Sequence, residues 1–371
     1  AGLCISDIDL QPMRLDDSQP ELKNTRPDFI IIQHESVFDP RHYGIPIEKN
    51  IERFFSPSDS LSGQLNVEIF GGGSWQSEFS MLTGLSSRSF GADSYHLYKK
   101  GAGRFQHSLP STLQRLGYRA NLIAACRRNF MHYDTFYAGL GIADRAFNED
   151  LKPPFDMKRF EQTSSDEMFL GAAECEIAER LILNSDPCCA IVLTNFNHGP
   201  HDRRQVPPSI YEKERAFALS KVPEAQYGEY YSRLAETVAS WDRLKANLAS
   251  RFPDRPMILV RYGDHQPVMT RRLEAALPLA DDDSRQFKTF FVIEGINMEL
   301  AEVPALPASG LDIAFLGTVA LRAAGLPLDR VSATRASLIA DCGSAYFPSK
   351  SRRKQQFHRT LVDLGLIDLR P

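Results

Sequence analysis

Side chains able to bind a metal ion follow two apolar runs of this 371-residue chain. Glu35 comes just after the run 28–33, and Asp264 and His265 come soon after the run 256–261. Neighbouring residues of a strand point to opposite faces, so Asp264 and His265 can meet on one ion only where the strand has ended. A glycine before them and a proline two residues after them are typical of such an end.

A hydroxyl group lies in the glycine-rich segment 71–79, GGGSWQSEF. Three glycines let the backbone approach a ligand closely, and Ser74 then falls near a predicted helix start, where backbone N–H groups favour an anion. The segment matches neither the dinucleotide-binding fingerprint nor the Walker A loop. The alternative interpretation is a plain glycine turn with Ser77 as the N-cap of the following helix.

Two histidines, His198 and His201, follow the apolar run 189–194 in the sequence NFNHGPH. The Gly-Pro pair between them indicates a loop rather than a helix face. Such a pair is either a functional pair at a strand end or an ordinary solvated or structural one.

Taken together, these segments supply one possible ligand set: Glu35, Ser74, Asp264 and His265. Three oxygens and one nitrogen suit a single Mn²⁺ or Zn²⁺ ion, with Mg²⁺ as a further option. A metal lowers the pKa of a bound hydroxyl, so Ser74 is expected to be both a ligand and a nucleophile.

The elements that must position these residues alternate along the chain. Nearly continuous apolar runs predict parallel strands buried on both faces, at 28–33, 119–124, 189–194, 256–261 and 289–293. Amphipathic stretches between them predict helices, at 77–82, 111–116, 166–183, 227–250 and 311–324. We therefore expect an α/β fold with a mostly parallel central sheet and helices on both faces. Its functional site should lie at the carboxyl ends of the strands.

Composition excludes several classes of protein. With 43 Lys and Arg against 47 Asp and Glu, the net charge of −4 gives no case for a nucleic-acid partner. The longest apolar runs fall well short of the ~18 residues that span a bilayer. Six cysteines without a C-x-x-C pair predict no disulfide, and the adjacent Cys188 and Cys189 should be buried thiols. The first residues show no signal peptide, so the chain is either cytoplasmic or preceded by a segment absent here.

We expect three regions along the chain. Residues 1–27 are polar and proline-containing and should form a linker or an arm on the surface, and 28–345 should form the catalytic domain. Residues 346–371 should form a basic C-terminal tail, whose segment 350–359 carries five Lys or Arg. That segment is either solvated or rests on anionic lipid headgroups.

The order of these motifs resembles a known family. GGGSWQSEFSMLTGL, with HES upstream and HGP and YGDHQP downstream, is similar to the alkaline phosphatase superfamily over about residues 28–325. The closest likeness is to the branch of lipoteichoic acid synthases and osmoregulated-glucan phosphoglycerol transferases. The resemblance implies an alkaline phosphatase/sulfatase-like fold. It also implies that Glu35, Asp264 and His265 are metal ligands and that Ser74 stands where the family has its nucleophilic Thr.

The resemblance also suggests substrate-binding residues. His198 is similar to the S-H-G-P histidine of phosphoethanolamine transferases, which serves a second metal or the substrate phosphate. His201 is a further candidate for binding a second metal or the substrate. Teichoic acid synthases hold glycerol phosphate with a Trp and an Arg where this chain has Met131 and Tyr133. Arg128 and His132 are the candidates to replace that Trp and Arg. Trp75 either lines a sugar or acyl subsite or packs in the core.

The function that the resemblance implies is transfer of sn-glycerol 1-phosphate from phosphatidylglycerol to an extracytoplasmic glycan through a phosphoseryl intermediate. Alternatives are a phosphoethanolamine transferase, a phosphodiesterase or phosphatase, or a binding module without turnover. A sulfatase is disfavoured because Ser74 lacks the C/S-x-P-x-R context of the formylglycine precursor. By family, the domain should face the membrane surface from the periplasmic or extracytoplasmic side, anchored by an upstream segment.

Overall fold

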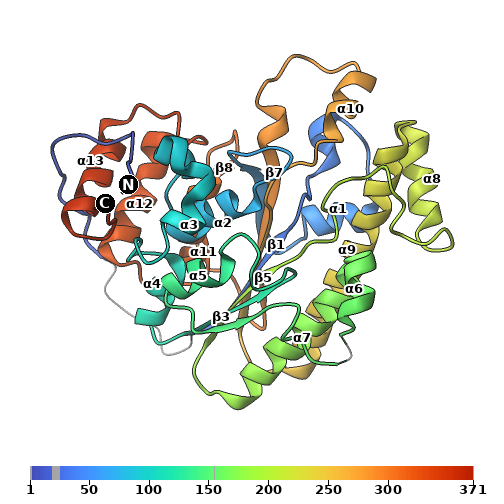
Figure 1. The fold of residues 1–371 in the computed structure, drawn as a ribbon, viewed down its shortest axis with the longest axis horizontal. Helices are drawn as coiled ribbons and strands as arrows, with labels where there is room; N and C mark the ends of the chain where they lie inside the picture. The colour runs from blue at the N-terminus through green and yellow to red at the C-terminus, as the bar shows by residue number, and fades with distance from the viewer. Residues whose placement is uncertain (1, 19–25, 154, 371) are drawn as a thin grey trace.

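A single eight-stranded sheet forms the centre of the computed structural model, which describes residues 2–18, 26–153 and 155–370. The strands lie in the order β4-β3-β5-β1-β6-β7-β2-β8, with helices packed on both faces (Figure 1). Their bounds are β1 Asp28–His34, β2 Ser60–Asn66, β3 Arg119–Ala124, β4 Asp144–Ala146, β5 Cys188–Leu193, β6 Met257–Gly263, β7 Lys288–Ile296 and β8 Leu311–Asp312.

Alternation along the central strand divides the core into two layers. Phe29 and Ile31 of β1 pack in the layer of α2 and α11, whereas Ile30 and Ile32 pack in the layer of α7 and α9. Because both sets are buried, the centre of the strand, residues 29–32, is continuously apolar, as the sequence predicted. The helices are α1 Lys49–Phe55, α2 Ser74–Thr83, α3 Leu97–Lys100, α4 Leu109–Arg115, α5 Tyr133–Gly139, α6 Met157–Thr163, α7 Asp166–Leu183, α8 Glu212–Lys221, α9 Ala225–Arg251, α10 Thr270–Ala276, α11 Ile313–Ala323, α12 Arg330–Cys342 and α13 Arg352–Asp363.

The mostly parallel sheet is confirmed, with one strand direction corrected. β1 is parallel to β5 and β6, and β3 is parallel to β4 and β5. The expected parallel strand at 289–293 exists as β7, but it runs antiparallel to β6 and to β2. The short helix α10, a 3-10 turn at Arg285–Phe287 and loops separate β6 from β7. Because the two strands pair antiparallel, the chain enters β7 at the edge of the sheet where β6 ended.

The sequence analysis missed three strands and several helices, and it placed the start of α2 three residues too late. β2 has only one fully buried residue, and β4 and β8 are two or three residues long, so none carries a strong apolar run. The helix expected from 77 begins at Ser74, with Gly73 at its N-cap. The interpretation of Ser77 as the N-cap is therefore wrong, and Ser74 occupies the first helical position.

Both ends of the described chain pack against the helices α12 and α13 (Figure 1). Met13 and Asp16 donate backbone hydrogen bonds to the hydroxyls of Thr360 and Thr334 at 2.9 and 2.7 Å. Residues 1, 19–25 and 371 of the expected arm and tail lie outside the described residues. Within the basic segment 350–359, Lys354 is fully buried, so this segment is not a uniformly exposed basic surface.

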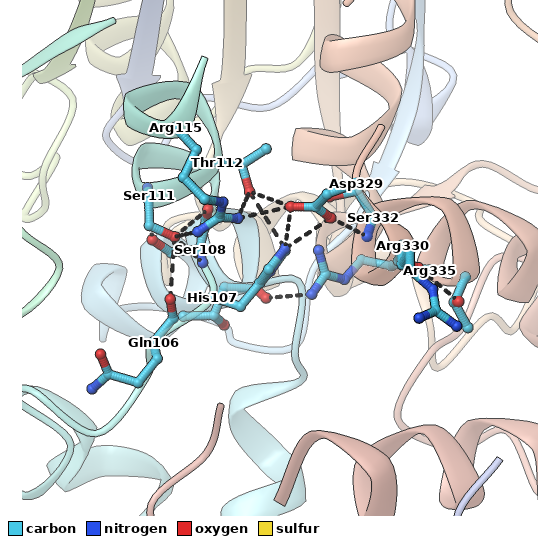
Figure 2. A network of polar contacts seen from close by, with 12 residues as sticks. Gln106, His107, Ser108, Ser111, Thr112, Arg115, Asp329, Arg330, Ser332 and Arg335 are labelled. Carbon is cyan, nitrogen blue, oxygen red and sulfur yellow. Dashed lines mark hydrogen bonds and ion pairs between the residues drawn. The ribbon is translucent and has the colours of Figure 1, made fainter. Parts of the chain in front are cut away.

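A polar network joins α4 to the start of α12, as Figure 2 shows. Asp329 caps α12 by accepting from the backbone of Ser332 at 2.8 Å. Its carboxylate also contacts His107 Nε2 at 2.9 Å and Arg115 at 2.7 Å. Burial by itself would raise the pKa of Asp329, but the contacts with His107 and Arg115 lower it below its ordinary value.

All six cysteines are free, as predicted, and Cys188 and Cys189 are buried in β5. Burial raises the pKa of both thiols, which makes them unreactive. Across the described ranges, no helix combines the length and the apolar character that crossing a membrane requires.

Candidate functional site

Three of the predicted metal ligands meet at the carboxyl edge of the sheet. Glu35 follows β1 and Asp264 and His265 follow β6, and these two strands are direct neighbours. One ligand atom from each residue lies within 4.8 Å of the others, and all three side chains are buried. The sequence spacing therefore identified a real cluster.

Ser74 joins this cluster from the first turn of α2. Its Oγ donates to Glu35 Oε2 at 2.7 Å and lies 3.4 Å from His265 Nε2. The preceding glycines make this position possible, because Gly71 and Gly73 have φ angles of 74° and 91°. A Cβ on Gly71 would lie 2.7 Å from Val268 Cγ2, and one on Gly73 would lie 2.9 Å from the side-chain oxygen of Gln76.

The donor atoms of the cluster suit a cation. Asp264 Oδ1 accepts from the backbone N–H groups of Ser36 and His265, each at 2.7 Å, whereas Oδ2 is buried without a hydrogen-bond partner among the described residues. His265 Nδ1 lies 3.0 Å from the carbonyl oxygen of Gln266. That backbone contact leaves Nε2 facing the carboxylates, as in many metal-binding histidines.

The charges of the cluster also favour a bound cation. Burial, followed by repulsion from Glu35, raises the pKa of Asp264 to about 8. Burial opposes ionisation of Glu35 as well, but the charge and hydrogen bond of His265 lower its pKa to about 2. Despite its burial, His265 has its pKa raised to about 9 by Asp264 and Glu35. Two carboxylates this close repel each other, and a divalent cation held by Glu35, Asp264, His265 and Ser74 would relieve that repulsion.

A cavity of about 460 Å³ opens beside Ser74. Its walls come from the ends of β1 and β5, the first turns of α2, the segment 125–133 and the helix α6. His198 lines this cavity and is exposed, with Nδ1 2.6 Å from the carbonyl oxygen of Gly199. The cavity is therefore deep enough for a small head group next to the hydroxyl of Ser74.

His201 does not line the cavity. Its ring is buried against Tyr230 in an edge-to-face arrangement, and burial lowers its pKa to about 3. In the part of the chain that the structure describes, Glu35, Asp264 and His265 form the single cluster of three metal-binding residues. The described residues therefore do not form the second three-residue metal cluster that the sequence analysis considered for His201.

Two predicted substrate-binding residues also lie outside the cavity walls. Arg128 forms ion pairs with Asp134 and Asp150, at 2.7 and 2.6 Å, and His132 is an exposed residue at the N-cap of α5. Arg127 and Phe130 of the same segment line the cavity instead. The sequence could not select among these neighbours because loop geometry decides which side chain turns inward.

Trp75 does line the cavity, and its indole Nε1 donates to the carbonyl oxygen of Tyr95 at 2.9 Å. The sequence analysis missed Asn148, whose side chain is 6% exposed, lines the cavity and carries an Oδ1 without a hydrogen-bond partner among the described residues. Asn148 follows β4, a three-residue strand that leaves no recognisable pattern in the sequence.

Comparison with known proteins agrees with this architecture. Residues 27–293 match the family model described as Sulfatase. The chain is 25% identical over 313 residues to an uncharacterized protein of Haemophilus influenzae, covering 82% of this chain and 55% of that protein. It is 25% identical over 253 residues to the capsular polysaccharide biosynthesis protein RkpI of Rhizobium meliloti, covering 66% and 42%. The chain thus spans about half the length of the curated relatives it matches.

Solved structures share the fold. The phosphoglycerol transferase GacH of Streptococcus pyogenes, in complex with sn-glycerol-1-phosphate, superposes with a TM-score of 0.67 at 16% identity, covering 92% of this chain and 86% of that chain. The lipoteichoic acid synthase LtaP of Listeria monocytogenes superposes with a TM-score of 0.59 at 17% identity, covering 81% and 72%. The expected alkaline phosphatase/sulfatase-like fold is confirmed.

Proposed function

Since this chain belongs to the sulfatase family, within the alkaline phosphatase superfamily, we propose that it is a metal-dependent phosphotransferase that moves sn-glycerol 1-phosphate from phosphatidylglycerol to a glycan. The observation that carries the proposal is the Ser74 hydroxyl, hydrogen-bonded to Glu35 at 2.7 Å at the edge of the cavity. The fold shared with a phosphoglycerol transferase supports the reaction class.

The first step is attack by Ser74 on the donor. The Ser74 proton passes to Glu35 Oε2, the Oγ–phosphorus bond forms, and the bond from phosphorus to the diacylglycerol oxygen breaks. His198, whose ring lines the cavity, neutralises the phosphate oxygens and supplies the leaving oxygen with a proton. A divalent cation bound by Glu35, Asp264 and His265 supplies Lewis-acid stabilisation of the negative charge.

The second step releases the serine. An acceptor hydroxyl attacks the phosphoseryl group and passes its proton to His198, which gave one up in the first step. The bond from the acceptor oxygen to phosphorus forms, the Oγ–phosphorus bond breaks, and Glu35 returns the proton to Ser74. Trp75 lines the cavity next to Ser74, where an aromatic face suits an apolar or sugar portion of a substrate. Ping-pong kinetics follow from this order.

The cavity favours a neutral polyol over an ammonium head group. Asn129, Asn148 and Asn195 line it, and amides pair well with vicinal hydroxyls. Its two carboxylates outside the metal cluster are both engaged, because Glu161 pairs with Arg127 and Glu78 accepts four hydrogen bonds. An ammonium group would need a free carboxylate, so we favour phosphoglycerol over phosphoethanolamine.

The acceptor and the location are proposed by analogy. The matched relative RkpI is a capsular polysaccharide biosynthesis protein, which supports a glycan acceptor. A lipid donor requires a membrane surface, so we place the domain at the periplasmic or extracytoplasmic face. The ion proposed is a single Mn²⁺ or Zn²⁺, with Mg²⁺ as the alternative.

Intact-mass measurement after incubation with phosphatidylglycerol tests the proposal. The protein loaded with Mn²⁺ should gain a glycerophosphoryl adduct and release diacylglycerol, whereas Ser74→Ala and protein treated with a chelator should not. An adduct from phosphatidylethanolamine alone would reverse the choice of head group. Release of diacylglycerol and free glycerol phosphate without an acceptor would indicate a phosphodiesterase. No adduct and no release with any donor would contradict the proposal.

A further inference from the structure

Glu78 is a buried carboxylate at the floor of the cavity, one turn after Ser74 on the helix α2. Its side chain is 1% exposed and accepts four hydrogen bonds. Oε1 accepts from Gln33 Nε2 and from the hydroxyl of Tyr133, each at 2.8 Å. Oε2 accepts from the hydroxyls of Tyr98 and Tyr137, at 2.7 and 2.9 Å.

These four bonds use the whole accepting capacity of the carboxylate, which is about four lone-pair sites. Glu78 therefore has no site left for a substrate hydroxyl. It also forms no ion pair within the described ranges, although a buried carboxylate without a cation is unfavourable. Burial, ahead of the hydrogen bonds that oppose it, raises the pKa of Glu78. With all its accepting sites occupied and no ion pair, Glu78 has a role other than binding substrate.

Three of the four donors come from elements that carry the rest of the site, and the fourth, Tyr98, comes from α3. Gln33 lies two residues before Glu35 on β1, and its Oε1 accepts from Tyr262 of β6, the strand that leads to Asp264, at 2.7 Å. Tyr133 lines the cavity and, with Tyr137, belongs to α5. One carboxylate thus joins the helix of Ser74 to both ligand-bearing strands and to the cavity wall.

We infer that Glu78 is a positioning residue, which holds Ser74, the end of β1 and the α5 wall of the cavity in the arrangement that the reaction requires. The inference rests on the proposed nucleophilic role of Ser74. A misplacement of about 1 Å at a reacting atom can reduce a rate by about 100-fold, so a shift of α2 would matter even though Glu78 does not touch substrate.

The substitution Glu78→Gln tests this role with little change in volume. The amide must donate where one carboxylate oxygen accepted, so one pair of donors loses its acceptor. We expect kcat for bis(p-nitrophenyl) phosphate with Mn²⁺ to fall at least ~10-fold. Mn²⁺ affinity by calorimetry should change by less than ~3-fold, because Asp264 and His265 keep their own backbone contacts and Glu35 keeps the hydrogen bond from the Ser36 hydroxyl.

Hydrogen exchange measures the positioning without reference to activity. In Glu78→Gln, backbone amides of 74–83 and 125–137 should exchange faster, while those of α7 and α9 should not. The matched control is Asp28→Asn, because Asp28 is a buried carboxylate at the start of β1 that accepts from the backbone N–H of Cys188 at 2.7 Å and does not line the cavity. It should lower the melting temperature without changing kcat or exchange near Ser74.

The outcomes separate the two proposals. A Glu78→Gln protein that keeps kcat within twofold, or whose exchange at 74–83 and 125–137 increases no more than that of α7 and α9, would overturn the positioning role. If Glu78→Gln does not fold, Tyr137→Phe removes a single donor and should still lower kcat several-fold with faster exchange at 125–137. A wild-type protein inactive on every phosphodiester would contradict the proposed function, and the exchange pattern would still decide the role of Glu78.

Discussion

At the scale of single residues, the site combines two buried side chains fixed by backbone contacts, Asp264 and His265, with one exposed side chain, His198. Asp264 and His265 are each anchored by backbone contacts, which keeps their remaining donor atoms aimed at one point. His198 is exposed at the cavity, and among the described residues its ring has one hydrogen-bonding contact, from Nδ1 to the carbonyl oxygen of Gly199. The proposed mechanism therefore has it act on substrate rather than hold the metal.

Replacing His198 by Gln tests that division. We expect kcat/KM for a phosphodiester to fall about 100-fold, as for loss of a general acid, while Mn²⁺ affinity by calorimetry stays within ~3-fold. His132→Gln is the matched control, because His132 is exposed and lies outside the cavity walls. Equal losses in both variants would refute a special role for His198.

At the scale of elements, the glycine segment before α2 decides where Ser74, the proposed nucleophile, lies. Gly73 caps the helix in a left-handed conformation, so Ser74 starts the helix with its hydroxyl on Glu35. The end of β1 supplies Glu35 and the end of β6 supplies Asp264 and His265, the other two candidate ligands. The site is thus built from two adjacent strand ends and one helix start.

The substitution Gly73→Ala tests whether the cap of α2 positions Ser74, apart from the loss of stability that backbone strain alone causes. A side chain at a φ of 91° is strained, and its Cβ would press on Gln76, so we expect a loss of ~1–2 kcal/mol in the free energy of unfolding and at least a tenfold loss in kcat. Gly103→Ala carries the same kind of strain at a φ of 72°, with nothing within 4 Å of the new Cβ. It should lose similar stability in urea unfolding and keep its activity. Retained activity in Gly73→Ala would show that the cap does not position Ser74.

The contact between α4 and α12 should depend on pH. The pKa of Asp329 is lowered in the folded state, so its stabilisation is present above its unfolded pKa of about 4 and is lost as pH falls below that value. Asp329→Asn keeps an N-cap residue but removes the charge, and should be about 2 kcal/mol less stable at pH 7. Urea unfolding at pH 7, 5 and 3 should show this difference shrinking at pH 3. A difference that does not change with pH would exclude the charge as its cause.

At the scale of the whole molecule, the two ends of the chain are fastened together beside the catalytic sheet. Lys354 of α13 is fully buried, donates to the carbonyls of Tyr346 and Ser349 at 2.8 Å each, and pairs with Asp7 of the N-terminal segment. Part of the basic C-terminal segment therefore stabilises the fold. The division into an arm, a catalytic domain from 28 to 345 and a tail stays a prediction.

Lys354→Met should reveal this role. Removing one partner of a buried pair leaves Asp7 uncompensated, so we expect the free energy of unfolding to fall by about 3–5 kcal/mol in urea. Arg352→Met on the same helix removes an ion pair to Asp9 from a side chain that is 69% exposed, and should change stability by less than ~1 kcal/mol. Similar small effects of both substitutions would argue against Lys354 as a structural fastener.

The sequence by itself located the candidate metal-binding residues, the hydroxyl beside them and the edge of the sheet where they meet. Glu35, Ser74, Asp264 and His265 each follow a local signal, an apolar run that ends or a glycine-rich turn, and such signals depend only on neighbours along the chain. Only the tertiary structure decided that Arg127 rather than Arg128 lines the cavity, that Asn148 faces it, that Glu78 collects four donors and that β7 runs antiparallel. These features arise from the packing of segments far apart in sequence, and no periodicity within one segment encodes them.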